Sequence, residues 1–258
     1  MEQKFFFFDI DNTLAVWPEG KIPDSAQYCI DELQRRGHLV SIATGRIQVD
    51  AMRFAEQARI TNVVADGGHS ITIDGKLVSM IGMNREMCIQ YLEYLESKHI
   101  PWAVTDRNKL GRITPYKEIL EWHPDWDVFK TVVDPEFDFH SVEDFYKIYV
   151  FFKDGEEEEK DIEHMTHKLI RYGEGCVLYE PMEKALGVRN MIEHFHMKPN
   201  QVVVFGDGYN DLSMFRPEWL NIAMGNARAE LKLAADYITT DCDKDGIYNA
   251  CKHFGWID

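Results

Sequence analysis

The sequence has no long run of hydrophobic residues. The longest run near its start, Phe5-Phe6-Phe7-Phe8, ends at Asp9 and is far too short for a signal peptide or a membrane-spanning helix. We therefore expect a cytoplasmic protein that has no membrane partner. At 258 residues, with 45% hydrophobic and 28% charged residues, the chain can still bury a sizeable core.

Cysteine and positive charge are both scarce. The five cysteines are scattered, without the paired spacing of a cysteine metal site, and their odd number argues against a disulfide framework. We expect buried, reduced thiols. The 44 acidic residues outnumber the 28 basic ones, which gives a formal net charge of -16. This charge disfavours nucleic acid as a partner, and any phosphate site needs local positive compensation.

Apolar runs alternate with helical patterns at both ends of the chain, which predicts an α/β fold with a parallel sheet. A helix opened by Pro23-Asp24-Ser25 and stopped by Gly37 separates the first two strands. The strands expected in the two end regions are residues 4–8, 38–43, 62–65, 201–205, 221–224 and 236–239. Further helices are expected at 46–57 and 185–196, with another starting at 211–215, and a β-hairpin around Asp74-Gly75 at 71–80.

The middle of the chain has a different pattern. A helix at 86–98 is followed by an irregular aromatic stretch, a strand at 146–152, a helix at 157–172 and a strand at 176–180. This α+β pattern predicts an inserted second domain, residues 82–180, within a core formed by residues 1–81 and 181–258.

Carboxylates follow two of the predicted buried strands directly. Asp9-Ile10-Asp11-Asn12-Thr13 comes after the phenylalanine strand, and Gly206-Asp207-Gly208-Tyr209-Asn210-Asp211 comes after the strand that ends at Phe205. Ligands bind beyond the carboxyl ends of strands in open parallel sheets, and clustered carboxylates suit Mg²⁺. The alternative for either motif alone is a set of solvated loop residues or helix caps. Two such motifs together favour a metal site.

Two further segments obey the same rule of placement. Thr44-Gly45-Arg46 ends the second strand with a hydroxyl and a helix start, where backbone N–H groups can hold a phosphoryl oxygen. Thr44 alone is more typical of a helix N-cap. Lys184 precedes the helix at 185–196 and can reach the same crevice, although a lone lysine there is usually a surface residue.

These four segments resemble the four motifs of the haloacid dehalogenase superfamily, and they follow the same order along the chain: Asp9–Thr13, Thr44–Arg46, Lys184 and Gly206–Asp211. The later runs Ile222–Ala227, Ala234–Tyr237 and Asp245–Ile247 are similar to its Cof-type branch of sugar-phosphate phosphatases. The resemblance implies a Rossmann-like, doubly wound core with an inserted smaller α/β cap. There are departures, because Asn12 replaces a usual glycine and Asp66-Gly67-Gly68 stands where Asn-Gly-Ala is more common. Asp66 would disfavour an anionic substrate or favour one that carries an amine.

The resemblance also implies a mechanism for phosphomonoester hydrolysis. Asp9 would attack phosphorus to form an aspartyl-phosphate, and Asp11 would act as general acid and then as general base. Mg²⁺ would be held by the side chains of Asp9 and Asp207 and by the backbone carbonyl of Asp11. Asp211 would hold the waters of the metal ion. The phosphate-binding residues would be Thr44, Gly45, Lys184 and Asn210.

The substrate expected from this resemblance is a small phosphomonoester, most simply a sugar phosphate. The chain is expected to be a monomer or a weak homo-oligomer. In the inserted domain the candidate polar contacts are Asp106, Arg107, Asn108 and Arg112, set among Trp102, Trp122 and Trp126. Two alternatives stay open, a phosphomutase or phosphotransferase with the same chemistry and a non-catalytic protein that binds phosphorylated metabolites.

Overall fold

The computed structural model describes residues 2–125, 128–153, 156, 162 and 169–258. The chain divides into two compact units. The first consists of residues 1–80 and 182–258, and the second of residues 81–181. Among the described residues, no helix is long and apolar enough to cross a membrane.

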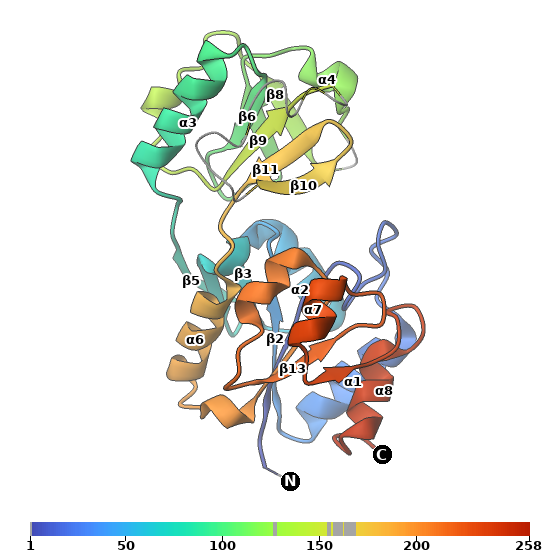
Figure 1. The fold of residues 1–258 in the computed structure, drawn as a ribbon. Helices are drawn as coiled ribbons and strands as arrows, with labels where there is room; N and C mark the ends of the chain where they lie inside the picture. The colour runs from blue at the N-terminus through green and yellow to red at the C-terminus, as the bar shows by residue number, and fades with distance from the viewer. Residues whose placement is uncertain (1, 126–127, 154–155, 157–161, 163–168) are drawn as a thin grey trace. The chain divides into compact units, whose positions relative to one another are not determined.

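The first unit is built on an eight-stranded sheet (Figure 1). In spatial order its strands are β14 (Tyr237–Ile238), β13 (Leu220–Ala223), β12 (Val202–Gly206), β1 (Phe5–Phe8), β2 (Leu39–Ala43), β3 (Asn62–Ala65), β4 (Ser70–Ile73) and β5 (Lys76–Met80). Every pairing from β14 to β3 is parallel, and β4 and β5 add two antiparallel strands at one edge. The parallel core predicted from the alternating pattern is therefore confirmed.

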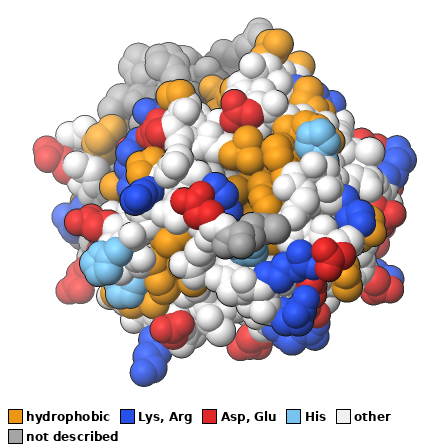
Figure 2. All heavy atoms as spheres, turned by 90° about the horizontal axis from the view of Figure 1, so that it is seen from below, with side chains coloured by type: hydrophobic (Ala, Val, Ile, Leu, Met, Phe, Trp, Pro, Cys, Tyr) orange, Lys and Arg blue, Asp and Glu red, His pale blue; other side chains and the backbone are white. Residues whose placement is uncertain are grey.

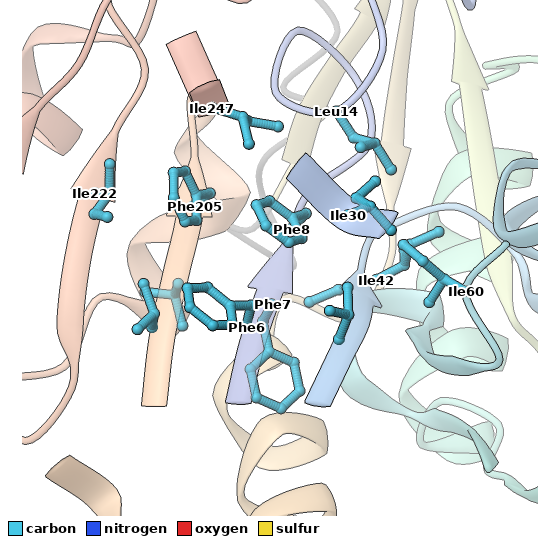
Figure 3. Packing of buried hydrophobic residues seen from close by; sticks show 14 of the residues in the cluster. Phe6, Phe7, Phe8, Leu14, Ile30, Ile42, Ile60, Phe205, Ile222 and Ile247 are labelled. Carbon is cyan, nitrogen blue, oxygen red and sulfur yellow. The ribbon is translucent and has the colours of Figure 1, made fainter. Parts of the chain in front are cut away.

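The four phenylalanines of β1 are buried on both faces of this sheet. Phe5 and Phe7 point to one face, where Phe195 contacts Phe5, and Phe6 and Phe8 point to the other, with ring centroids 6.3 Å apart. Figure 3 shows Phe8 beside Phe205 of β12, with Leu14 and Ile30 nearby. A strand with both faces buried needs a continuous apolar run, and this explains why the pattern does not alternate.

Helices cover both faces of the sheet (Figure 1). They are α1 (Asp24–Arg35), α2 (Gln48–Ala58), α6 (Lys184–His194), α7 (Ala229–Ala234) and α8 (Gly246–His253), with short 3₁₀ turns η1 (Asp66–Gly68), η3 (Pro199–Gln201) and η4 (Tyr209–Met214). Gln27 of α1 donates to the carbonyl of Ala58 at 3.1 Å, which ties α1 to α2. Segment 211–215, expected to begin an α-helix, is largely 3₁₀, because the Asp211 side chain binds backbone N–H groups at the start of the turn.

The predicted hairpin forms as β4 and β5. Both central residues of its two-residue turn have positive φ, +49° at Asp74 and +76° at Gly75. These are the angles that a tight Asp-Gly turn requires between antiparallel strands.

The second unit contains a six-stranded sheet. In spatial order its strands are β10 (Leu169–Gly173), β11 (Cys176–Tyr179), β9 (Lys147–Phe151), β6 (Trp102–Thr105), β7 (Gly111–Thr114) and β8 (Lys130–Val133). Of the strand pairs that the structure describes in this sheet, β7 and β8 alone are parallel. Among the described residues of this unit, the helices are α3 (Arg85–Ser97), α4 (Ile119–Trp122) and the 3₁₀ turn η2 (Phe139–Ser141). A buried cluster around Trp102 and Phe145 joins α3 to this sheet.

Two expectations for the middle of the chain were wrong. Residues 169–172, the last part of the helix expected at 157–172, lie in strand β10 instead, because Leu169 and Ile170 pair with Tyr179 and Leu178 across the sheet. Residues 157–161 and 163–168 of that helix lie outside the described part. The irregular aromatic stretch contains β6, β7 and β8, whose short apolar segments gain stability from cross-strand partners rather than from local pattern.

Figure 2 shows one face of the molecule, on which acidic and basic side chains lie interspersed with hydrophobic and uncharged ones. On this face the described residues form no continuous basic stripe of the kind that binds nucleic acid.

Because β1 is buried, truncation of one of its side chains should lower the stability of the protein by a large amount. Phe7→Ala should lower the free energy of unfolding by about 3–5 kcal/mol, because it removes a fully buried ring and leaves a cavity. Leu233→Ala, at a side chain that is 88% exposed on α7, should change it by less than about 0.5 kcal/mol. Urea unfolding followed by circular dichroism measures both. Equal losses for the two variants would contradict the assignment of β1 as the central strand.

Candidate active site

Three polar residues lie at one edge of the sheet because their strands are neighbours. Asp9 follows β1, Thr44 follows β2 and Asp207 follows β12, and β1 pairs in parallel with both of the other strands. Their carboxyl ends therefore open on the same edge of the sheet. Asp9 and Thr44 are buried, and Asp207 is partly exposed.

Lys184 joins this edge from α6. It is the first residue of the helix and is wholly buried, and its ammonium donates to Asp9 Oδ1 at 2.7 Å and to Asp211 Oδ1 at 2.6 Å. Burial lowers the pKa of Lys184, but the carboxylates of Asp211 and Asp9 outweigh it, so the pKa is raised overall. Lys184 is therefore charged at any ordinary pH.

Asp211 is the second buried partner of Lys184 and also organises the loop after β12. Its Oδ2 accepts hydrogen bonds from the backbone N–H groups of Asp207 and Gly208, both at 2.9 Å. A Cβ at Gly206 would lie 2.7 Å from this carboxylate, so the glycine makes room for it. Asp211 thus fixes the backbone that presents Asp207.

The cluster carries more negative charge than its lysine can offset. Oxygens of Asp9, Asp207 and Asp211 all lie within 4.8 Å of one another, so three carboxylates face one ammonium. Burial and the neighbouring Asp211 raise the pKa of Asp207 to about 7, and the same two causes raise the pKa of Asp9 well above its usual range. A divalent cation would neutralise the two excess charges, and hard carboxylate oxygens are the donors that Mg²⁺ prefers. The residues present fit this ion.

Asp11 does not bond to Lys184 and is paired instead with the guanidinium of Arg46. Arg46 donates to both carboxylate oxygens of Asp11, at 2.9 and 2.7 Å, and also to Asp50 at 2.6 Å. The Asp11 side chain is 38% exposed, which contrasts with the buried Asp9. Arg46 stands two residues after Thr44 in the same motif, but the sequence alone did not predict this pairing with Asp11.

Asn12 stands in the left-handed region with φ of +56°. Asparagine adopts this region more readily than most other residues that carry a Cβ, so it can replace the usual glycine there. Its side-chain oxygen accepts from the N–H of Trp17 at 3.3 Å, a bond that glycine lacks. Its carbonyl accepts from Asn226 at 2.9 Å. Thr13, the next residue, donates to Asp207 Oδ1 at 3.2 Å and so links the two acidic loops.

The other predicted phosphate-binding residues lie in loops at this edge. The hydroxyl of Thr44 accepts from the N–H of Arg46 at 3.1 Å, and Gly45 lies between them. Asn210 is partly buried in η4, directly before Asp211. The structure thus brings Asp9, Lys184, Asp207 and Asp211 into direct or near contact, with the other candidates on the loops around them.

The departure at residues 66–68 also has a structural explanation. Asp66 is buried, and its Oδ2 accepts from the N–H of Gln48, the first residue of α2. Gly68 has φ of +109°, and a Cβ there would lie 2.2 Å from the carbonyl oxygen of Glu183. The N–H of Glu183 in turn donates to the carbonyl of Gly67 at 2.8 Å. This turn therefore packs directly against the residue that precedes Lys184.

Two of the candidates in the second unit are buried within that unit. Arg112 lies among the rings of Phe129, Tyr149 and Phe151, and Trp102 belongs to the core beneath α3. Asp106 and Arg107 instead line a cavity of about 410 Å³ together with Phe137, Ser141, Val142, Glu143 and Asp144. Trp126 lies outside the described residues.

The sequence and the fold are similar to those of known hydrolases. A sequence profile of the haloacid dehalogenase-like hydrolases matches residues 6–251. The putative phosphatase YkrA of Bacillus subtilis is 30% identical over 263 residues, with both chains covered in full. A putative bifunctional phosphatase/peptidyl-prolyl cis-trans isomerase of Streptococcus pyogenes is 28% identical over 99% of this chain, which spans 54% of that longer protein. A solved subclass IIB sugar phosphatase is 26% identical, with a TM-score of 0.79 and coverage of 99% and 100%.

The excess charge predicts that one acidic residue lowers the stability of the metal-free protein. Between the ordinary pKa of aspartate and about pH 7, folded Asp207 holds a proton that the unfolded chain has lost, so stability falls as pH rises through this window. At pH 8 in EDTA, Asp207→Asn should therefore stabilise the fold, on the order of 1–4 kcal/mol.

Scanning calorimetry with EDTA or with MgCl₂ measures this effect. The wild type should gain stability from Mg²⁺, and Asp207→Asn should gain much less. Asp243→Asn, at an exposed acidic residue next to Cys242, should behave like the wild type in both conditions. A wild type that does not respond to Mg²⁺ would contradict the assignment of a cation site.

Proposed function

Because the chain belongs to the haloacid dehalogenase-like hydrolases and is a phosphatase of that family, we propose that it hydrolyses phosphomonoesters of small metabolites, sugar phosphates above all. The proposed cofactor is Mg²⁺ and the proposed intermediate is an aspartyl-phosphate on Asp9. The observation that carries the proposal is the cluster of Asp9, Asp207 and Asp211 beside the buried ammonium of Lys184. The name of the related sugar phosphatase supports the substrate class.

Asp9 is proposed as the nucleophile. It is held by Lys184 at the end of the central strand, where one carboxylate oxygen accepts from the ammonium and the backbone is pinned by a bond from its N–H to Phe205. A fixed carboxylate loses little entropy when it attacks, and positioning supplies much of the rate enhancement in phosphoryl transfer. The second step is hydrolysis of the acyl phosphate by water.

Asp11 is proposed as the residue that protonates the leaving oxygen and then deprotonates the attacking water. It lies two residues after Asp9 and is partly exposed, so it can meet solvent and substrate. Arg46 orients its carboxylate through two hydrogen bonds. The two aspartates therefore occupy different environments.

Mg²⁺ would be held by the carboxylates of Asp9 and Asp207 and by the backbone carbonyl of Asp11, with Asp211 holding the surrounding waters. When bound, it supplies positive charge that offsets the dianionic phosphoryl group. The proposed contacts to the phosphoryl oxygens come from Thr44, Gly45, Asn210 and the Lys184 ammonium. Residues 82–180 are proposed as the cap that selects the substrate, and its cavity beside Asp106 and Arg107 supports this.

Removal of the nucleophile tests the proposal. A screen of phosphorylated metabolites with Mg²⁺ should reveal release of inorganic phosphate by the wild type. Asp9→Asn should lower kcat about 10³-fold or more on every substrate that is turned over, because the amide cannot form the acyl phosphate. The variant keeps the size of the side chain.

Asp74→Asn is the matched control, since asparagine also suits the left-handed turn of the β4–β5 hairpin. Its kcat should equal that of the wild type. Substantial turnover by Asp9→Asn would exclude Asp9 as the nucleophile, and a wild type inactive on every substrate would contradict the proposed function.

A further inference from the structure

Trp17 is a large aromatic side chain that stays exposed beside the candidate active site. Trp17 is 54% exposed and lies in the short loop between Asn12 and the start of α1. Isolated exposed hydrophobic residues are common and need no explanation. This one is held in place, because its N–H donates to Asn12 Oδ1 and its ring lies 5.7 Å from the Arg46 guanidinium carbon.

The anchoring extends from Trp17 to Asp11 through Arg46. The guanidinium of Arg46 also lies over Phe54, at 4.5 Å, and makes the two bonds to Asp11 and the one to Asp50. Its positive charge is thus already paired with two carboxylates. The indole, the guanidinium and the Asp11 carboxylate form one continuous group within the first unit.

The position of this group determines what it would contact. A general acid must lie within hydrogen-bond reach of the oxygen that it protonates, so the leaving group has to lie at the Asp11 carboxylate. Arg46, which is partly exposed, contacts that carboxylate, and the exposed indole of Trp17 lies beside Arg46. Because the charge of Arg46 is neutralised, the indole supplies an apolar, flat surface and not a second anion site.

We propose that Trp17 is a specificity-determining residue that favours leaving groups with a ring directly beside the scissile oxygen. The inference rests on the proposed function, and in particular on Asp11 as the acid. A planar ring or the C–H face of a sugar can stack on the indole, whereas a short acyclic alcohol cannot cover it. Asn12 acts here as a positioning residue, because its side chain ties down the loop that carries the indole.

The test compares kcat/KM for two substrates with a ring, phenyl phosphate and glucose 1-phosphate, with that for acyclic glycerol 2-phosphate. The wild type should prefer the ring substrates. Trp17→Ala should lower the ratio of ring to acyclic kcat/KM about tenfold, through KM, while Trp17→Phe keeps most of the ratio. Asn12→Gly, which suits the backbone angle but loses the bond to Trp17, should lower the ratio in the same direction.

Tyr28→Ala is the control, because Tyr28 is a similarly exposed aromatic residue on α1 and should leave the ratio unchanged. The inference is overturned if the wild type prefers the acyclic substrate, or if Trp17→Ala lowers kcat/KM equally on all three. A wild type inactive on every phosphomonoester overturns the proposed function itself, which is a separate and recognisable result.

Discussion

The ammonium of Lys184 is the group on which the candidate site depends. It is buried at the start of α6 and bridges Asp9 at the end of β1 and Asp211 in the turn after β12. These three segments are far apart in sequence, and a buried charge left without its partner typically costs about 3–5 kcal/mol. The bridge therefore ties the two sequence segments of the first unit together at the point where the acidic loops converge.

The same bridge leaves the acidic residues in two different environments. Asp9, Asp207 and Asp211 cluster beside one buried ammonium and keep excess negative charge, while Asp11 is partly exposed and is paired with Arg46, which also binds Asp50. Burial raises the pKa of Asp9 and of Asp207, and the neighbouring Asp211 carboxylate raises both further; a divalent cation would offset this excess charge. Function and marginal stability are therefore linked, since the charges that suit a cation destabilise the metal-free fold.

Much of this arrangement could be predicted from the sequence, because it depends on the ends of strongly apolar strands. Two continuous apolar runs, Phe5–Phe8 and Val202–Phe205, are readily predicted as buried strands, and this places Asp9 and Asp207 at one edge of the sheet. Contacts between distant side chains could not be predicted, so the pairing of Arg46 with Asp11 and the place of Trp17 required the structure. Strands β6, β7, β8 and β10 of the second unit were missed, because short segments such as Gly111–Thr114 are stabilised by cross-strand partners and not by a local pattern.

The most direct test of the account is chemical trapping of the intermediate. A wild-type reaction on a turned-over phosphomonoester is quenched in acid within the first turnover and digested, and the peptide that contains Phe5–Lys21 is sequenced by mass spectrometry. The account predicts a phosphoryl group on Asp9 that hydroxylamine removes. Turnover without any phosphoryl group on this peptide, or with the group on Asp11, would contradict it.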